Sequence, residues 1–329
     1  MSPEYPSASL LSELDQWRDA ADSPDREREI WRILTRAARN ADFPILLDYA
    51  YDHGLATPCE TPKRGQGRAP SWTHPIDGST LIWIGPGRFL VGSDDRLAES
   101  EGFALARFPI TNAQFQTFLN ETAYQPPLRH PDNALFLKHW GPHRVLPEAL
   151  QDHPVVWVSF FDALAYCSWA GLALPTEWLW EKAARGPEGR RYPWGDHTPF
   201  GPYVWAGGPT YPLPLARIQR TGTCAVGEFA KSRSPYGCED LIGNVSEWCW
   251  LDEAAIPDFG RFPEPNPQVV VPHSHQMGYE AVRGSCFLRM STQLMASSHR
   301  RRLSNTRRNQ WTGFRPSLFL PCRPVVRDS

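Results

Sequence analysis

A dense group of basic side chains near residue 300 is the clearest binding chemistry in this 329-residue sequence. His299 is followed directly by Arg300, Arg301 and Arg302. Further basic or aromatic residues flank this run: Arg289, Arg307, Arg308 and Trp311. Planar guanidinium groups bind carboxylates and phosphates through paired hydrogen bonds. The cluster therefore predicts a binding face for an anionic small molecule or an acidic peptide. The alternative is that these arginines are structural or merely solvated.

A second segment with possible binding chemistry is GNVSEW at 243–248. Asn244 and Glu247 supply oxygen atoms three residues apart, and backbone carbonyls near Leu241 and Val245 can complete a shell. Calcium prefers such hard oxygen ligands. The pattern predicts a structural calcium site, and the alternative is an Asn that caps a turn beside a Glu that pairs with an arginine.

The cysteines and histidines lack the spacing of a zinc site. The seven cysteines are scattered without a C-x-x-C pair, and their number is odd, so reduced thiols are expected. His273 and His275 form a local pair in a polar stretch flanked by prolines. Exposed loop histidines are favoured there over metal ligands.

Composition excludes several classes of protein. Hydrophobic residues make up 41% and the net charge is -2, which argues against a disordered chain and against a nucleic-acid binder that relies on positive charge. No stretch approaches the roughly 20 apolar residues of a membrane span, and the first residues lack the pattern of a signal peptide. We therefore expect no membrane or nucleic-acid partner and a cytoplasmic location. The 33 prolines, 24 glycines and 14 tryptophans favour a loop-rich fold held by aromatic packing.

The pattern of elements predicts an α+β fold. Residues 1–60 indicate two short helices, one that begins after the cap signal at Ser23 and one from about Pro44 to His53. They are expected to pack against the rest of the chain or against a partner protein. Residues 61–77 are typical of a linker. Beyond them, LIWIGPGRFLVGS predicts a hairpin around 85–87, and Thr111, Ser159 and Thr176 are typical N-caps of three helices.

Seven segments, taken in order, resemble the formylglycine-generating enzymes, also called the sulfatase-modifying-factor domain. They are FLVGSDD (89–95), RFPITNAQFQTFL (107–119), the run from HPVVWVS to EKAARG (153–186), YPWGD (192–196), YGCEDLIGNVSEW (236–248), AVRGS (281–285) and TGFRP (312–316). The resemblance covers residues 78–323 and leaves 324–329 as a tail. It implies a C-type-lectin-like fold with two main helices, a structural calcium at GNVSEW, and structural roles for Arg302 and Arg315.

The sequence departs from this family at the copper site. If the resemblance extended to the copper site, this chain would bind copper(I), as formylglycine generators do, through two cysteines spaced C-x4-C after a GGS motif. Counting from 283–285 places these positions near Leu288 and Gln293, whereas counting back from 313–315 gives Arg289 and Leu294. Neither register supplies the soft thiolate that copper(I) prefers, and Cys286 stands too early without a partner. Copper is therefore not expected.

An iron site is not expected either. The sulfoxide synthases of the family hold iron(II) with three histidines, largely from a much larger N-terminal domain. Residues 1–60 of this chain offer only His53.

Two functions remain open. The first is a binding module that presents 286–311 as its face, as in the variable proteins of diversity-generating retroelements. Its ligand-binding residues would be Trp250, Arg289, His299, Arg300, Arg301, Arg307 and Trp311. The second is an oxidoreductase acting on an amino-acid derivative or peptide, with a metal or cofactor arrangement other than the cysteine pair or the three histidines. Ser285 and Cys286 would have positioning or redox roles, His299 and Arg300 would contact the substrate, and Trp250 would be a pocket wall.

Overall fold

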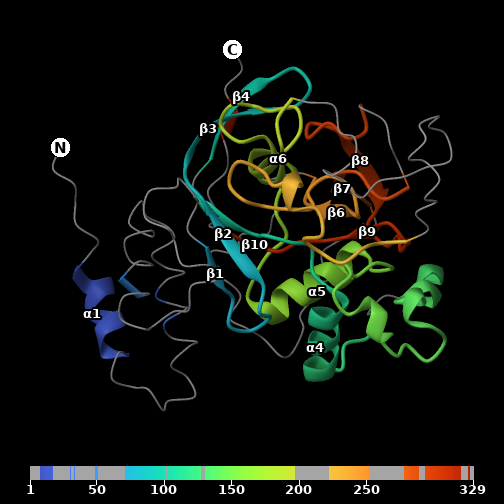
Figure 1. The fold of residues 1–329 in the computed structure, drawn as a ribbon. Helices are drawn as coiled ribbons and strands as arrows, with labels where there is room; N and C mark the ends of the chain where they lie inside the picture. The colour runs from blue at the N-terminus through green and yellow to red at the C-terminus, as the bar shows by residue number, and fades with distance from the viewer. Residues whose placement is uncertain are drawn as a thin grey trace.

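The computed structural model describes residues 8–17, 30, 33, 49–50, 71–100, 102–126, 130–196, 222–251, 278–288, 293–319 and 325–326. Within these ranges, small sheets pack with short helices and long loops (Figure 1). No helix in them is long and apolar enough to cross a membrane.

The strands form three sheets. The first has the order β1 (Ser71–Thr73), β2 (Thr80–Ile84), β5 (Phe103–Ala106) and β10 (Ser317–Phe319). The second has the order β11 (Val325–Val326), β4 (Arg96–Ser100) and β3 (Gly87–Val91). The third has the order β8 (Arg300–Ser304), β7 (Tyr279–Arg283), β6 (Ser246–Cys249) and β9 (Thr312–Gly313), with β6 and β9 parallel.

The hairpin that we predicted around 85–87 is wrong. β2 pairs with β5, whereas β3 pairs with β4, so the chain passes from one sheet to another at Gly85. The buried ammonium of Lys182 holds this crossing, because it donates to the carbonyl of Gly85 and to Ser100 Oγ, each at 2.8 Å. A hairpin would have required Ile84 to face β3, but Ile84 is paired with Phe103.

Three helices begin at the predicted caps. α4 (Asn112–Thr122), α5 (Phe160–Ala170) and α6 (Glu177–Arg185) follow Thr111, Ser159 and Thr176, whose side chains accept hydrogen bonds from backbone N–H groups of the first turn. Between α4 and α5 lie the 3-10 helices η1 (Pro131–Leu135), η2 (Lys138–Trp140) and η3 (Glu148–Leu150); η5 (Ala230–Ser232) follows later.

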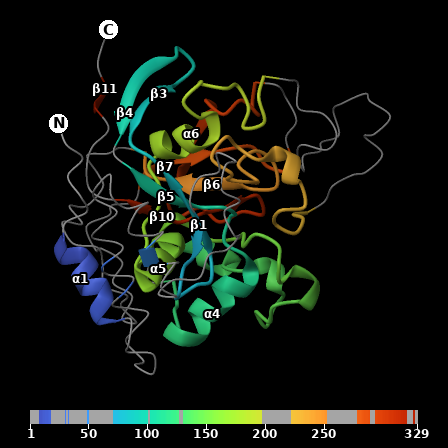
Figure 2. The same ribbon diagram turned by 60° about the vertical axis from the view of Figure 1, so that its left-hand side comes forward.

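α4 and α5 lie against each other (Figure 2). Aromatic side chains fill the core around them. The Phe115 ring lies 5.9 Å from that of Tyr166, and Phe314 packs edge-on against Tyr166 at 5.3 Å. Such ring pairs add stability beyond the apolar area that they bury. Phe314, which follows β9, is thereby packed against α4 and α5. This agrees with the prediction of a loop-rich fold held by aromatic packing.

The folded domain begins before the predicted boundary at residue 78. Trp72 in β1 is buried and β1 pairs with β2, so residues 71–77 are part of the domain rather than of a linker. Residues 61–70 lie outside the described residues.

The N-terminal segment contains a helix that we did not predict, α1 (Ala8–Gln16). Its Leu10 and Leu14 are buried and belong to the hydrophobic cluster that also holds Trp72. The two predicted helices further on are described only at Ile30, Ile33, Tyr49 and Ala50, which are all helical.

Candidate ligand-binding cavity

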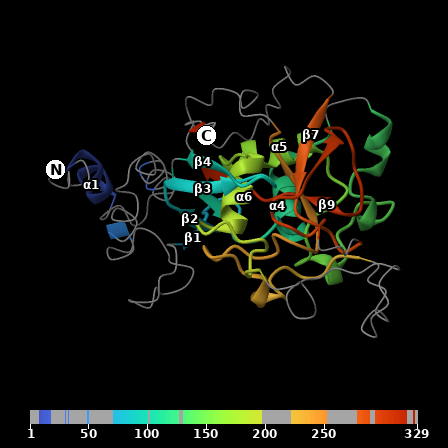
Figure 3. The same ribbon diagram turned by 90° about the horizontal axis from the view of Figure 1, so that it is seen from above.

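A cavity of about 900 Å³ lies where three parts of the chain meet: the turn between β3 and β4, one face of α6, and the segment 293–300. α6 packs against both β3 and β7 at this place (Figure 3). Acidic and basic side chains line it in equal number: Asp94, Asp95, Glu177, Glu181 and Asp196 with Arg96, Arg185, Arg191, Arg283 and Arg300. The cavity is therefore highly charged but close to neutral as a whole.

α6 supplies the cavity floor through residues spaced four apart. Glu177, Glu181 and Arg185 follow one another at intervals of one helical turn and so lie on one face of the helix. Thr176 fixes the first turn by accepting a hydrogen bond from the N–H of Leu179 at 3.2 Å. Glu177 then stands at the helix N-terminus, where the helix dipole favours a carboxylate.

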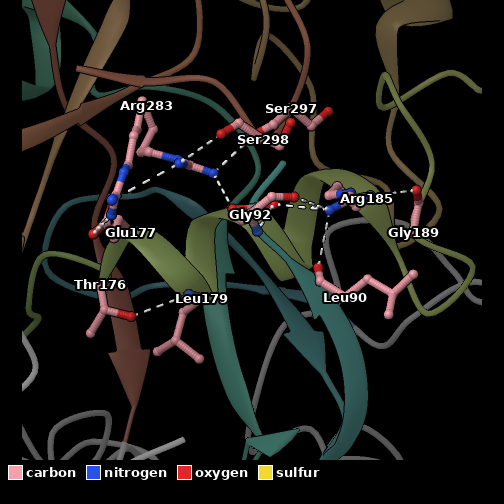
Figure 4. A network of polar contacts seen from close by, with 12 residues as sticks. Leu90, Gly92, Thr176, Glu177, Leu179, Arg185, Gly189, Arg283, Ser297 and Ser298 are labelled. Carbon is pink, nitrogen blue, oxygen red and sulfur yellow. Dashed lines mark hydrogen bonds and ion pairs between the residues drawn. The ribbon is translucent and has the colours of Figure 1, made fainter. Parts of the chain in front are cut away.

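Glu181 is the centre of a buried ion-pair network with Arg185 and Arg283. Figure 4 shows these two arginines at the two ends of the network. Its Oε2 accepts a hydrogen bond from Arg283 Nη2 at 2.5 Å, and its Oε1 accepts from the Gly92 N–H at 2.9 Å and from Arg185 Nη1 at 3.1 Å. Arg283 also donates to the carbonyl of Ser297 at 2.9 Å. These paired charges hold β7, α6, the β3–β4 turn and the 293–300 segment together.

Glu177 is less completely paired. Its Oε1 accepts a hydrogen bond from Arg300 Nη1 at 3.0 Å, but its Oε2 is buried without a hydrogen-bond partner among the described residues. Arg283 Nη1 lies 3.9 Å from that oxygen. Burial raises the pKa of Glu177, and the charges of Arg283 and Arg300 oppose this rise.

Two of the predicted site residues reach the cavity. His299 and Arg300 both line it, and the side chain of Arg300 is 52% exposed. Ser285 and Cys286 are buried and are not among the residues that line it. The structure therefore does not bring the three predicted catalytic candidates together at this cavity.

Trp250 does not form a pocket wall, contrary to our prediction. It is 1% exposed, and its ring packs edge-on against Phe160 at 4.9 Å. Its backbone pairs beside Thr176, so this tryptophan belongs to the core behind α6.

The remaining members of the arginine cluster point to different places. Neighbouring side chains alternate between the two faces of a strand, and Arg301 donates to Ser246 Oγ at 2.8 Å while Arg300 contacts Glu177. Arg307 lies 3.9 Å from Asp132, and Trp311 does not line the cavity. Arg302 is exposed, in contrast to the structural role that the resemblance implies. Arg289 and the pair His273 and His275 lie outside the described residues.

The positions equivalent to the copper ligands carry no thiol. Leu288 is half-buried, Gln293 is exposed and Leu294 is half-buried. Cys286 is buried, as are the other four cysteines that the structure describes. No group of three or more His, Cys, Asp or Glu side chains is arranged to hold a metal within the described ranges.

The predicted calcium ligands are used differently in this geometry. Both Glu247 oxygens accept hydrogen bonds from Arg315 at 2.7 Å, and one also accepts from Trp180 Nε1 at 2.7 Å. The Asn244 side chain exchanges two hydrogen bonds of 3.1 Å with the backbone of Cys224. This arrangement does not fit a calcium shell built on the two side chains and matches the alternative of a turn-capping Asn and an arginine-paired Glu. Calcium binding at this motif stays a prediction.

Most residues that line the cavity were not predicted from the sequence. Glu177, Glu181 and Arg185 stand in the helix EWLWEKAAR at intervals of four, and this spacing was the available signal. Arg283 lies in the AVRGS motif, which defines the register of the copper positions but does not indicate that this arginine lines a cavity. Nothing in the local sequence indicates that these residues meet the turn at 92–95.

The fold and motifs define the class of the protein. The family model described as "Sulfatase-modifying factor enzyme 1-like domain" matches residues 69–317, and the chain belongs to this family. The predicted α+β, C-type-lectin-like fold is therefore confirmed.

Individual relatives include both active and inactive enzymes by name. The chain is 34% identical to "Inactive C-alpha-formylglycine-generating enzyme 2" of Mus musculus over 51% of this chain and 67% of that protein. It is 34% identical to the formylglycine-generating enzyme of Thermomonospora curvata over 51% and 70%. It is 33% identical to hercynine oxygenase of Mycolicibacterium smegmatis over 53% of this chain and only 46% of that protein.

A solved structure has the same fold. PvdO from Pseudomonas aeruginosa superposes with a TM-score of 0.53 and 19% identity, covering 76% of this chain and 98% of PvdO. At this identity the likeness concerns the fold alone.

Proposed function

We propose that this protein is a ligand-binding module built on the formylglycine-generating-enzyme fold, with the charged cavity beside α6 as its site. The observation that carries the proposal is the cavity itself, because it combines an exposed guanidinium, Arg300, with a fixed charged floor. Arg300 uses one nitrogen for Glu177 and can present its remaining N–H groups to an anionic group of a small molecule or peptide.

The proposal of a binding rather than an oxidase function rests on side-chain chemistry. Copper(I) requires soft ligands, and the positions that match the family's cysteine pair hold leucine, glutamine or arginine instead. Overall similarity does not separate the two functions, because the relatives named active and inactive are equally identical to this chain. Fold does not determine function, so the site residues must decide.

The second candidate is an oxidoreductase acting on an amino-acid derivative or peptide. The relatives named hercynine oxygenase and formylglycine-generating enzyme favour it. His299, which lines the cavity, would then contact the substrate. Ser285 and Cys286 are buried and do not line the cavity, so they would act behind the residues that do. This candidate requires a metal or cofactor arrangement other than the cysteine pair.

Binding at Arg300 can be tested with a panel of small carboxylates and phosphates. We expect members of the panel to shift NMR resonances of the cavity residues, and Arg300→Gln to weaken the best binder about tenfold, the loss of one charge-assisted contact. Arg88→Gln is the matched control, because the Arg88 side chain is 65% exposed and lies outside the cavity. A panel without any binder, or equal affinity of the Arg300→Gln variant and the wild type, would contradict the proposal.

A further inference from the structure

Two buried polar atoms of the cavity residues lack hydrogen-bond partners among the described residues. One is an acceptor, Glu177 Oε2, and the other is a donor, Arg283 Nε. Glu177 is 4% exposed and Arg283 is 1% exposed. Unsatisfied buried polar groups are rare in folded proteins because each loses its hydrogen bonds to water without replacement, so their presence in residues that line a cavity points to a ligand or to ordered water.

Of these two residues, Glu177 has fewer hydrogen bonds between its charged group and the side chains and carbonyls around the cavity. Arg283 already binds Glu181 Oε2 at 2.5 Å and the carbonyl of Ser297, so its guanidinium is committed to the floor of the cavity. Arg300 pairs with Glu177 Oε1 and is half exposed to solvent. Glu177 lines the cavity, and one of its carboxylate oxygens, which is buried, has no hydrogen-bond donor among the described residues.

A cationic group with N–H donors would complete this site. It would donate to Glu177 Oε2, while the outer N–H groups of Arg300 remain available for an anion. Both contacts involve the same carboxylate, because Arg300 is bonded to its other oxygen. The cationic and anionic groups of a ligand that uses both must therefore be only a few bonds apart.

We propose that Glu177 is a specificity-determining residue of the cavity, and that its ligand is a compact zwitterion of the α-amino acid class. The ammonium group of the ligand donates to Glu177 Oε2, and its carboxylate accepts from Arg300. Trp178 also lines the cavity and packs against Phe89, Val91 and Ala98, so it offers an apolar wall for a side chain. This inference rests on the proposed binding function and deepens it.

Three matched probes separate the contributions: L-phenylalanine, N-acetyl-L-phenylalanine, which lacks the ammonium, and 2-phenylethylamine, which lacks the carboxylate. Calorimetric or NMR titration of the full-length protein at pH 7 should give the highest affinity for L-phenylalanine. Glu177→Gln keeps the shape of the side chain and should weaken L-phenylalanine binding about tenfold while leaving N-acetyl-L-phenylalanine unaffected. Glu99→Gln, an exposed carboxylate on β4 outside the cavity, is the control.

The possible results are distinguishable. If N-acetyl-L-phenylalanine binds as well as L-phenylalanine and Glu177→Gln changes neither, the zwitterion inference fails but anion binding at Arg300 stands. If none of the three probes binds while members of the carboxylate and phosphate panel do, the zwitterion inference fails and the site proposed for the function stands. If neither the probes nor the panel bind, both fail. Should Glu177→Gln unfold, Glu177→Asp retains the charge at the helix N-terminus and is expected to lose the preference for the ammonium group, because its carboxylate is one methylene shorter.

Discussion

At the scale of single residues, buried arginine–carboxylate pairs are the dominant feature of this protein. Arg315 and Glu247 are both fully buried and form two parallel hydrogen bonds of 2.7 Å. Arg308 binds Asp162 in the same way at 2.8 and 2.9 Å. Such pairs fix the geometry of loops, and removing one partner leaves an uncompensated charge.

Arg315→Ala should therefore destabilise the protein strongly. The carboxylate of Glu247 would remain buried without its guanidinium partner, and the carbonyls of Ala106, Arg107 and Glu239 would lose their donor. We expect the free energy of unfolding to fall by about 3–5 kcal/mol, measured by urea denaturation. Arg88→Ala removes an arginine from an exposed pair and should cost less than about 1 kcal/mol. Equal effects of the two substitutions would contradict this assignment.

At the scale of elements, helix starts were predictable from the sequence and strand pairing was not. Thr111, Ser159 and Thr176 are local signals, because the cap bonds to the first turn that follows it. The partner of β2 depends instead on β5, and nothing local to residues 81–91 distinguishes that pairing from a hairpin. The alternation of side chains along β8 is also a local signal. It places Arg300 and Arg301 on opposite faces of the strand and so argues against a single arginine face.

The start of α4 is anchored to η2 through a histidine that must remain neutral. Asn112 uses its amide nitrogen for the carbonyls of Leu150 and His153, so its Oδ1 accepts hydrogen bonds from Trp140 Nε1 and His139 Nε2. Nδ1 of His139 is then unprotonated, buried and without a hydrogen-bond partner in the described part of the chain. Burial, with a smaller effect of the charge on His153, lowers the pKa of His139 to about 4.

This lowered pKa predicts a loss of stability in mild acid. The unfolded chain takes up a proton at this histidine below its ordinary pKa of 6.5, whereas the folded chain does so only near 4, so stability falls as the pH decreases between these values. From pH 7 to pH 5, the contribution of His139 amounts to about 2 kcal/mol. His139→Gln should lose that much less stability over this range in urea denaturation. His143→Gln, which replaces an exposed histidine, is the control. A pH dependence of His139→Gln identical to that of the wild type would exclude this explanation.

At the scale of the whole molecule, segments distant in the sequence form both the fold and the cavity. β10 pairs with β5, which joins the end of the domain to its beginning. The cavity unites the turn at 92–95, α6 and the segment 293–300. Composition and ordered motifs sufficed to predict the family and a loop-rich α+β fold, since these depend on the whole sequence. Of the predicted ligand-binding residues that the structure describes, only His299 and Arg300 line the cavity. Glu177 and Arg283 were not predicted, because their contacts are long-range and no local pattern encodes them.

Metal content, measured together with dioxygen uptake, distinguishes a binding module from a copper oxidase most directly. Protein purified without a histidine tag would be subjected to elemental analysis, and then reconstituted with copper(I) and, separately, iron(II) while dioxygen consumption is recorded. We predict no stoichiometric copper and no uptake above that of the free metal, because the positions that match the cysteine pair hold no soft ligand. We predict no stoichiometric iron either, because residues 1–60 offer only His53. One copper or iron per chain, with dioxygen consumed, would contradict the account and make the protein an oxidase with a different ligand set.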